Sequence, residues 1–327
     1  MQTSPTWSGT TDDADGARTP HAGDPATSAD ASPPASLAGV VVAALRPHQW
    51  VKNLLLVVPA VAAHRLDPGT LTSLGLAFAS FSLCASGGYI LNDLVDLAAD
   101  RQHHRKRHRP FASGRLTAQT GVLLIVLCWL TGFGLAAALL PPLFVAMAFG
   151  YLVCTTAYSL WLKREPVLDV MFLAGLYVMR VMAGGAAANV PVSTWFLAFT
   201  LFVCLSLAFL KRFIEVHAHR VAGTDTPMPG RGYLASDAQW LQSAGLTSAY
   251  LAVVVLAIYV NSADVTRLYT HPSRLLLVCP VLLFWATRWW LLAHRRRIHD
   301  DPVVAVAADP VTYVVGVIVA AVVLSAV

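Results

Sequence analysis

Long runs of apolar residues, separated by short polar segments, make up the chain from residue 39 onward. Eight of these runs reach the length of about 20 residues that a helix needs to cross a bilayer. They cover 71–91, 118–139, 142–161, 167–188, 192–210, 240–261, 273–293 and 310–327. A shorter run, 51–66, contains Pro59 and is either a kinked first span or an interfacial helix. We favour a span, so the pattern predicts an all-α integral membrane protein with about nine transmembrane helices.

The distribution of positive charge tests this count, because Lys and Arg gather in cytoplasmic loops. With the spans numbered from residue 51, basic clusters follow the second, fourth, sixth and eighth spans, at 101–115, 163–164, 211–220 and 295–297. The alternate loops hold far fewer basic residues. This alternation predicts a multi-pass protein whose N-terminus and basic loops are cytoplasmic.

Composition supports the membrane assignment and separates one segment from the rest. The chain has 327 residues, of which 56% are hydrophobic and 13% charged, whereas soluble domains carry about 25% charged residues. Residues 1–38 are instead rich in small and polar residues and lack the apolar side chains that would offset the entropy of folding. We predict a disordered cytoplasmic tail over 1–38 and one polytopic transmembrane catalytic domain over 39–327.

A group of acidic residues follows the second span, 71–91, in the sequence "NDLVDLAAD". On a helix, Asn92, Asp93, Asp96 and Asp100 fall within an arc of about 100°, so their side chains share one face. Carboxylates this close repel each other unless a cation joins them. Mg²⁺ is suited to this role, because it binds one or two carboxylates and completes its shell with water and substrate phosphates.

Basic residues come directly after these aspartates, and Arg101, Lys106 and Arg109 are candidate ligands for phosphate oxygens. An alternative is that the basic run is only a topology signal and the aspartates its counter-charges. Carboxylates that begin inside an apolar helix are costly and usually functional, however. Together the two groups predict a site for Mg²⁺ and a diphosphate.

These residues resemble the UbiA superfamily of intramembrane prenyltransferases, whose first signature is NDxxDxxxD. Segments spread over 45–310 are most similar to its decaprenyl-phosphate phosphoribosyltransferase branch: "LRPHQWVKNLLLVVP", "YSLWLKREPVLDV", "RVMAGGAA", "SLAFLKRFIEV" and "HDDPVVAV". The resemblance implies nine helices around a central cavity, two cytoplasmic loops that carry the site, and a place in the bacterial cell membrane. It implies Asp93, Asp96 and Asp100 as catalytic and metal-binding residues, with Asn92 contacting substrate.

The second loop departs from the superfamily pattern. Where prenyltransferases generally carry a second Asp-rich motif, this chain has Lys211, Arg212 and Glu215. Glu215 is the one remaining carboxylate there and a candidate metal ligand. Bases in place of acids favour a substrate with more phosphate, and phosphoribosyl pyrophosphate has an additional 5-phosphate.

Four further basic residues are candidate substrate ligands. Lys163 begins the fifth span, and Arg180 lies within its apolar sequence, where an arginine is costly unless it pairs with a carboxylate or faces a polar cavity. Arg46 and Lys52 precede or begin the first span, and a role as anchors for lipid headgroups explains them nearly as well.

The resemblance predicts a transferase that moves a phosphoribosyl group from phosphoribosyl pyrophosphate to a polyprenyl phosphate, with Mg²⁺ assisting the departure of pyrophosphate. One alternative is transfer of a prenyl group from a prenyl diphosphate to an aromatic or other acceptor, or cyclisation of that diphosphate, with aromatic rings around the cation. A transporter is a further alternative. The predicted partners are a polyprenyl lipid, a diphosphate-containing substrate and membrane lipids, with no nucleic acid, and the oligomeric state stays open.

Overall fold

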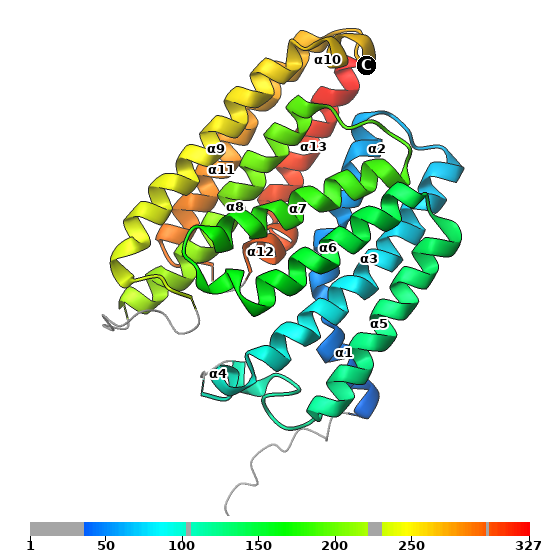
Figure 1. Ribbon diagram of the computed structural model, residues 1–327. Coiled ribbons are helices and arrows are strands. Elements are labelled where there is room, and N and C mark those ends of the chain that lie inside the picture. Colours follow the sequence, from blue (N-terminus) through cyan, green and yellow to red (C-terminus); the bar gives the residue numbers. More distant parts are fainter. Residues whose placement is uncertain (1–35, 103–105, 222–230, 299–300) are drawn as a thin grey trace, which may run out of the picture. The chain divides into compact units, whose positions relative to one another are not determined.

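The computed structural model describes residues 36–102, 106–221, 231–298 and 301–327, without the side chains of Arg220 and Val221. The predicted tail over 1–38 therefore lies almost wholly outside the described residues, as does Asp300. Every element in the described part of the chain is a helix, which confirms the all-α prediction (Figure 1).

Seven helices in the described residues are long and apolar enough to cross a membrane. They are α3 (Pro68–Val95), α5 (Ala118–Leu139), α6 (Pro142–Leu160), α7 (Leu168–Ala187), α8 (Thr194–Val221), α9 (Ala238–Val260) with the short η4 (Ala235–Asp237) before it, and α11 (Val278–His294) with η5 (Pro272–Leu277) before it. An eighth candidate is a pair bent by 75°, α12 (Pro302–Ala308) and α13 (Pro310–Ala326). The chain is a multi-pass membrane protein.

The predicted first span is divided into short elements. They are α1 (Leu37–Leu45), the 3₁₀-helix η1 (Pro47–Leu56) and α2 (Val58–Ala62). Arg46 separates α1 from η1 in a left-handed conformation, with φ of 53°, because the proline at 47 disfavours a helical conformation for the residue before it. None of the three is long enough to count as a span alone, so the count of nine stays a prediction.

Short elements connect the long helices: α4 (Leu97–Gln102), η2 (Lys106–His108), η3 (Leu162–Arg164) and α10 (Ala263–Leu268). Side-chain caps define several starts. Asp67 accepts a hydrogen bond from the Thr70 backbone N–H at 3.0 Å and fixes the start of α3, as an N-cap carboxylate does. At the other end of this helix, 28 residues later, lies the acidic motif.

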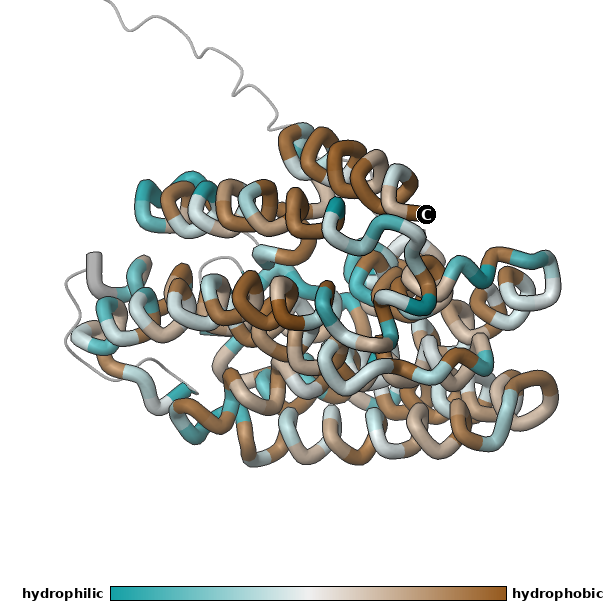
Figure 2. The backbone as a smooth tube through the Cα atoms, turned by 90° about the horizontal axis from the view of Figure 1, so that it is seen from above, coloured by the Kyte–Doolittle hydropathy of each residue, from teal (hydrophilic) through white to brown (hydrophobic). Residues whose placement is uncertain are grey.

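Two apolar cores meet at α7. One core joins α7 to α8, α9 and α11, and the other joins α7 to η1, α3 and α6; Figure 1 shows α7 between these two groups of helices. The outer surface is also apolar, with Leu130 at 68% and Val317 at 69% exposure, and apolar residues run along the outer helices (Figure 2). A surface of this kind fits contact with lipid chains.

The two halves repeat one arrangement. The helices α3 and α8 are each 28 residues long, and each packs along the next long helix, α5 and α9. The acidic motif lies at the end of α3, and Lys211, Arg212 and Glu215 lie near the end of α8. The fold therefore places two charged helix ends in corresponding positions.

Candidate functional site

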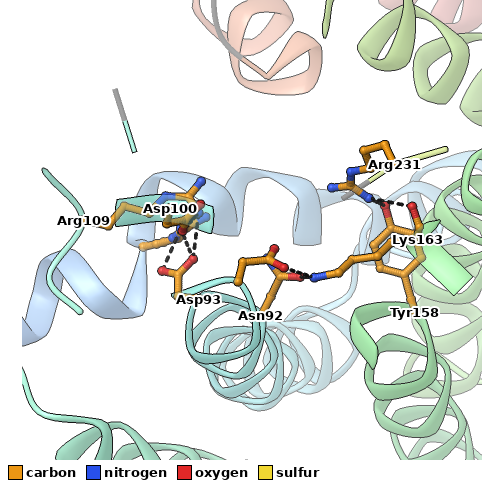
Figure 3. Close-up of polar contacts among 9 residues, drawn as sticks. Asn92, Asp93, Asp100, Arg109, Tyr158, Lys163 and Arg231 are labelled. Carbon is orange, nitrogen blue, oxygen red and sulfur yellow. Dashed lines mark hydrogen bonds and ion pairs between the residues drawn. The ribbon is translucent and has the colours of Figure 1, made fainter. Parts of the chain in front are cut away.

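Asp93 and Asp100 are brought together by one arginine. Asp93 is on the last turn of α3 and Asp100 is on α4; both side chains are buried. The same nitrogen of Arg109, Nη1, lies 3.1 Å from Asp93 and 2.6 Å from Asp100. Arg46 binds both oxygens of Asp93, at 2.6 and 2.8 Å. These bonds bring the junction between α1 and η1 and the loop after η2 to the acidic motif, and Figure 3 shows Arg109 beside Asp93 and Asp100.

Asp96 has a different partner. It is the C-cap of α3, and its carboxylate lies 2.5 Å from the ammonium of Lys163. Lys163 also donates to the side-chain oxygen of Asn92 at 3.0 Å, and Asn92 donates to Asp96 at 3.2 Å. Burial lowers the pKa of Lys163, and Asp96 partly opposes this shift. Figure 3 shows Lys163 reaching Asn92 from the end of α6.

The acidic side chains offer a two-carboxylate set for Mg²⁺. Within the described ranges, no three Asp, Glu, His or Cys side chains form a metal-ligand group. Asp93 and Asp100 nevertheless converge on one atom of Arg109, so a cation in that place contacts both. This set fits Mg²⁺, which needs one or two carboxylates and takes its other ligands from phosphate and water. Asp96, which was predicted as a third ligand, is instead bound to Lys163.

The end of α8 forms two separate networks. Lys211 lies 3.0 Å from Asp301, and Lys52 of η1 lies 2.7 Å from the same oxygen. Although burial raises it, the two lysines hold the pKa of Asp301 well below its usual range. No chemistry was predicted for Asp301, whose only signal was the acidic pair in "HDDPVVAV".

Arg212 is the centre of the other network. It is completely buried and contacts Asp169 of α7 at 2.5 Å and Glu215 one turn later. Tyr233 donates to Asp169 at 2.7 Å. Arg212 and Glu215 bind each other in this geometry, and the substrate contact of Arg212 and the metal contact of Glu215 stay predictions. Sequence reasoning missed Tyr233, which no pattern distinguishes from a packing aromatic residue.

Arg180 is buried within the bundle, as its apolar sequence predicted. It donates to Asn53 at 2.9 Å, to the Leu176 carbonyl at 2.7 Å and to the Tyr151 hydroxyl at 2.7 Å. Its guanidinium carbon lies 4.7 Å from the centre of the Tyr151 ring. Among the described residues it has no carboxylate partner, so one of the two predicted roles, pairing with a carboxylate, does not occur there.

The remaining predicted phosphate ligands lie on α4 and η2. Arg101 and Lys106 are both exposed. Arg231, which was not predicted, donates to Tyr158 at 3.1 Å and to the Lys163 carbonyl at 3.4 Å (Figure 3). Arg231 therefore lies beside Lys163, which binds Asp96 of the acidic motif.

The model of the UbiA prenyltransferase family matches residues 36–308. The chain belongs to this family. Its membership supports a membrane-embedded transferase, and it accounts for the acidic motif at the end of α3.

Solved structures of the family share this fold. A UbiA homolog from Archaeoglobus fulgidus bound to GPP and Mg²⁺ superposes with a TM-score of 0.66 at 15% identity, over 88% of this chain and 99% of that one. The likeness at this identity concerns the fold.

Similar sequences have several names. The uncharacterized protein y4nM of Sinorhizobium fredii is 36% identical over 84% of this chain, which spans about half (54%) of that protein's length. Nodulation protein NoeC of Azorhizobium caulinodans is 36% identical over 81% of this chain and 86% of its own. A decaprenyl-phosphate phosphoribosyltransferase of Mycobacterium tuberculosis is 38% identical over 57% of this chain and 63% of its own.

Proposed function

We propose that this protein transfers a phosphoribosyl group from phosphoribosyl pyrophosphate to a polyprenyl phosphate at the cytoplasmic face of a bacterial plasma membrane. The observation that carries the proposal is the chemistry at the end of α8. There Lys211 and Lys52 share one carboxylate, Asp301, in the part of the fold where a prenyltransferase would hold a second acidic metal motif. Similarity to decaprenyl-phosphate phosphoribosyltransferases supports it.

The acidic motif and its basic partners bind the leaving group in this proposal. Asp93 and Asp100 would hold Mg²⁺, which supplies positive charge to the pyrophosphate as it departs. Arg109, which contacts both aspartates here, then turns to phosphate oxygens. Arg46 and Lys163 keep Asp93 and Asp96 in place, and Asn92 fixes Lys163.

No general base is needed for the ribosyl reaction. The nucleophile is a lipid phosphate, which is already an anion and attacks C1 of the ribose while the bond from C1 to the pyrophosphate breaks. The protein's task is therefore to bring two anions together and neutralise them.

Prenyl transfer receives less support from the aromatic side chains. Aromatic rings around an allylic cation are what that reaction needs. Trp161, beside the basic pair at 163–164, is 67% exposed, and Tyr177 and Tyr151 lie against the guanidinium of Arg180. These two tyrosine rings already face a cation of the protein.

The test offers two pairs of substrates to purified protein in detergent with Mg²⁺. Labelled phosphoribosyl pyrophosphate with decaprenyl phosphate should yield label in the organic phase. Labelled prenyl diphosphate with 4-hydroxybenzoate should yield no prenylated 4-hydroxybenzoate. Product from the second pair alone would replace the proposed reaction by prenyl transfer.

A further inference from the structure

Lys52, Lys211 and Asp301 form a buried group with unequal charge. The side chain of Lys52 is 6% exposed and that of Asp301 13%, while Lys211 is 25% exposed. All three lie on different elements, η1, α8 and the start of α12. Two basic side chains share one oxygen of a single carboxylate, so bases outnumber acids in this group. We call these three residues the lysine pair and its carboxylate.

Arg180 adds a second unbalanced charge. Lys52 feels the positive charges of both Lys211 and Arg180, and Arg180 bonds to Asn53, the next residue after Lys52. The bonding partners of Arg180 in the described chain are all neutral. Among the described residues, three basic side chains therefore surround one carboxylate in a part of the protein shielded from water, and burial lowers the pKa of Lys52 there.

The neighbouring network on α8 does not cancel this excess. Asp169, Arg212 and Glu215 together carry one negative charge. Glu215 lies in the field of Arg231, Lys211 and Lys106 as well as Arg212, so four basic side chains share this one carboxylate.

The acidic motif, by contrast, is balanced within itself. Its three aspartates meet three cations: Arg46 and Arg109 on Asp93 and Asp100, and Lys163 on Asp96. A bound Mg²⁺ would add the charge that a diphosphate needs. The two parts of the site therefore differ in charge. The acidic motif can bind a metal together with a diphosphate, whereas the lysine pair and its carboxylate can bind an anion without a metal.

We infer that the lysine pair and its carboxylate, with Arg180 behind them, bind a phosphate monoester of a substrate, separately from the diphosphate at Asp93 and Asp100. Isolated buried charge is unfavourable unless a partner neutralises it, and a phosphate monoester supplies the negative charge that these basic side chains lack. This inference rests on the proposed function, which supplies two sources of such a group: the polyprenyl phosphate and the 5-phosphate of the ribosyl donor.

Binding of small probes tests this without catalysis. The unfolding temperature of the full chain in an uncharged detergent is measured at increasing concentrations of each probe. One phosphate probe is farnesyl phosphate, with farnesol as its match without phosphate. The other is ribose 5-phosphate, with ribose as its match. Variants Lys52→Gln and Lys211→Gln remove one cation each. Asp301→Asn removes the carboxylate's charge. It keeps a side-chain oxygen that can accept the hydrogen bond from the Val303 backbone N–H, which is 3.1 Å long in the wild-type chain.

The inference predicts that one phosphate probe binds and its match does not. Each lysine variant should bind that probe about tenfold more weakly, as expected for loss of a charge-assisted contact, whereas Asp301→Asn should bind it at least as well as wild type. Arg65→Gln, at an exposed ion pair before α3, should change nothing. Binding of farnesyl phosphate places the acceptor at the lysine pair, and binding of ribose 5-phosphate places the donor there.

The inference would be overturned if the wild-type protein bound neither phosphate probe better than its match. It would also be overturned if the lysine variants bound the probe as tightly as wild type does. A loss that is equal in Lys211→Gln and Asp301→Asn would also overturn it, because it indicates a structural role only. Failure of the proposed function looks different, because the phosphate probes would still bind while no label reaches a lipid.

Discussion

The guanidinium of Arg212 lies 2.5 Å from the carboxylate of Asp169, and both side chains are shielded almost completely, at 1% and 0% exposure. The contact joins α8 to α7, the helix that both apolar cores share. Tyr233 completes it by donating to Asp169 and accepting from the Val167 backbone N–H at 2.8 Å. Arg212 therefore ties α8 to α7, and its contact with substrate stays a prediction.

Removal of one partner should destabilise the protein strongly. Arg212→Met leaves Asp169 buried without a cation, which costs about 3–5 kcal/mol for a buried pair. The double variant Asp169→Asn with Arg212→Met should recover most of that loss, since no buried charge remains. Thermal unfolding in detergent measures both. If Arg212→Met instead kept wild-type stability but lost activity, the result would support the predicted contact between Arg212 and the substrate.

Gly184 allows α7 to approach the first segment closely. A β-carbon there would overlap the backbone carbonyl of Leu56, which cannot move as a side chain can. Gly184→Ala should lower the free energy of unfolding by about 1–3 kcal/mol, as overpacking does. Gly175, on the same helix, has open space around its Cα, so Gly175→Ala should raise stability by up to about 1 kcal/mol through helix propensity. Equal effects at both positions would contradict the close approach.

The lowered pKa of Lys163 predicts a pH dependence. As the pH rises through this lowered value, Lys163 loses its proton and its hold on Asp96, so kcat/KM should fall at a lower pH than an ordinary lysine allows. Lys163→Arg, which stays charged, should move the decline to higher pH. An unchanged profile in this variant would exclude Lys163 as the titrating group.

Stability should follow the opposite direction from activity in that pH range. The pKa of Lys163 is lower in the folded chain than in the unfolded chain. Between these two pKa values, therefore, the contribution of Lys163 to the free energy of unfolding grows as the pH rises. Thermal unfolding across the same range separates the two effects, since a decline in activity caused by unfolding would be accompanied by lower stability.

Much of the fold could be predicted because it depends on the length and polarity of runs. Seven long helices, the last apolar run over 310–327 and the acidic motif at the end of a helix all follow from local sequence, whereas the 75° bend between α12 and α13 does not. The first span did not follow, because Pro47 and Pro59 divide it into short elements whose path is set by packing against α7. Its length matches a span while its backbone is mostly 3₁₀-helical.

The site was predictable in composition and less so in pairing. Asp93, Arg46 and Lys163 were all named, but sequence spacing on one helix could not show that Asp96 pairs with Lys163, 67 residues away. The partners of Lys52 and Lys211 lie farther still, at Asp301, and only the fold joins them. Long-range ion pairs of this kind leave no periodic signal along the chain.

The acidic motif gives the most direct test of the proposed chemistry. Transfer of label from phosphoribosyl pyrophosphate to decaprenyl phosphate is measured with Mg²⁺ for wild type, Asp93→Asn and Asp67→Asn. Asp67 caps the opposite end of the same helix, and the hydrogen bonds from Thr70, together with Arg65, lower its pKa to about 2. It is therefore a charged carboxylate like Asp93 but lies far from the site. We predict transfer by wild type and by Asp67→Asn, and a loss of about 100-fold or more in Asp93→Asn. Wild-type rates in Asp93→Asn, or no transfer by folded wild type, would contradict the account.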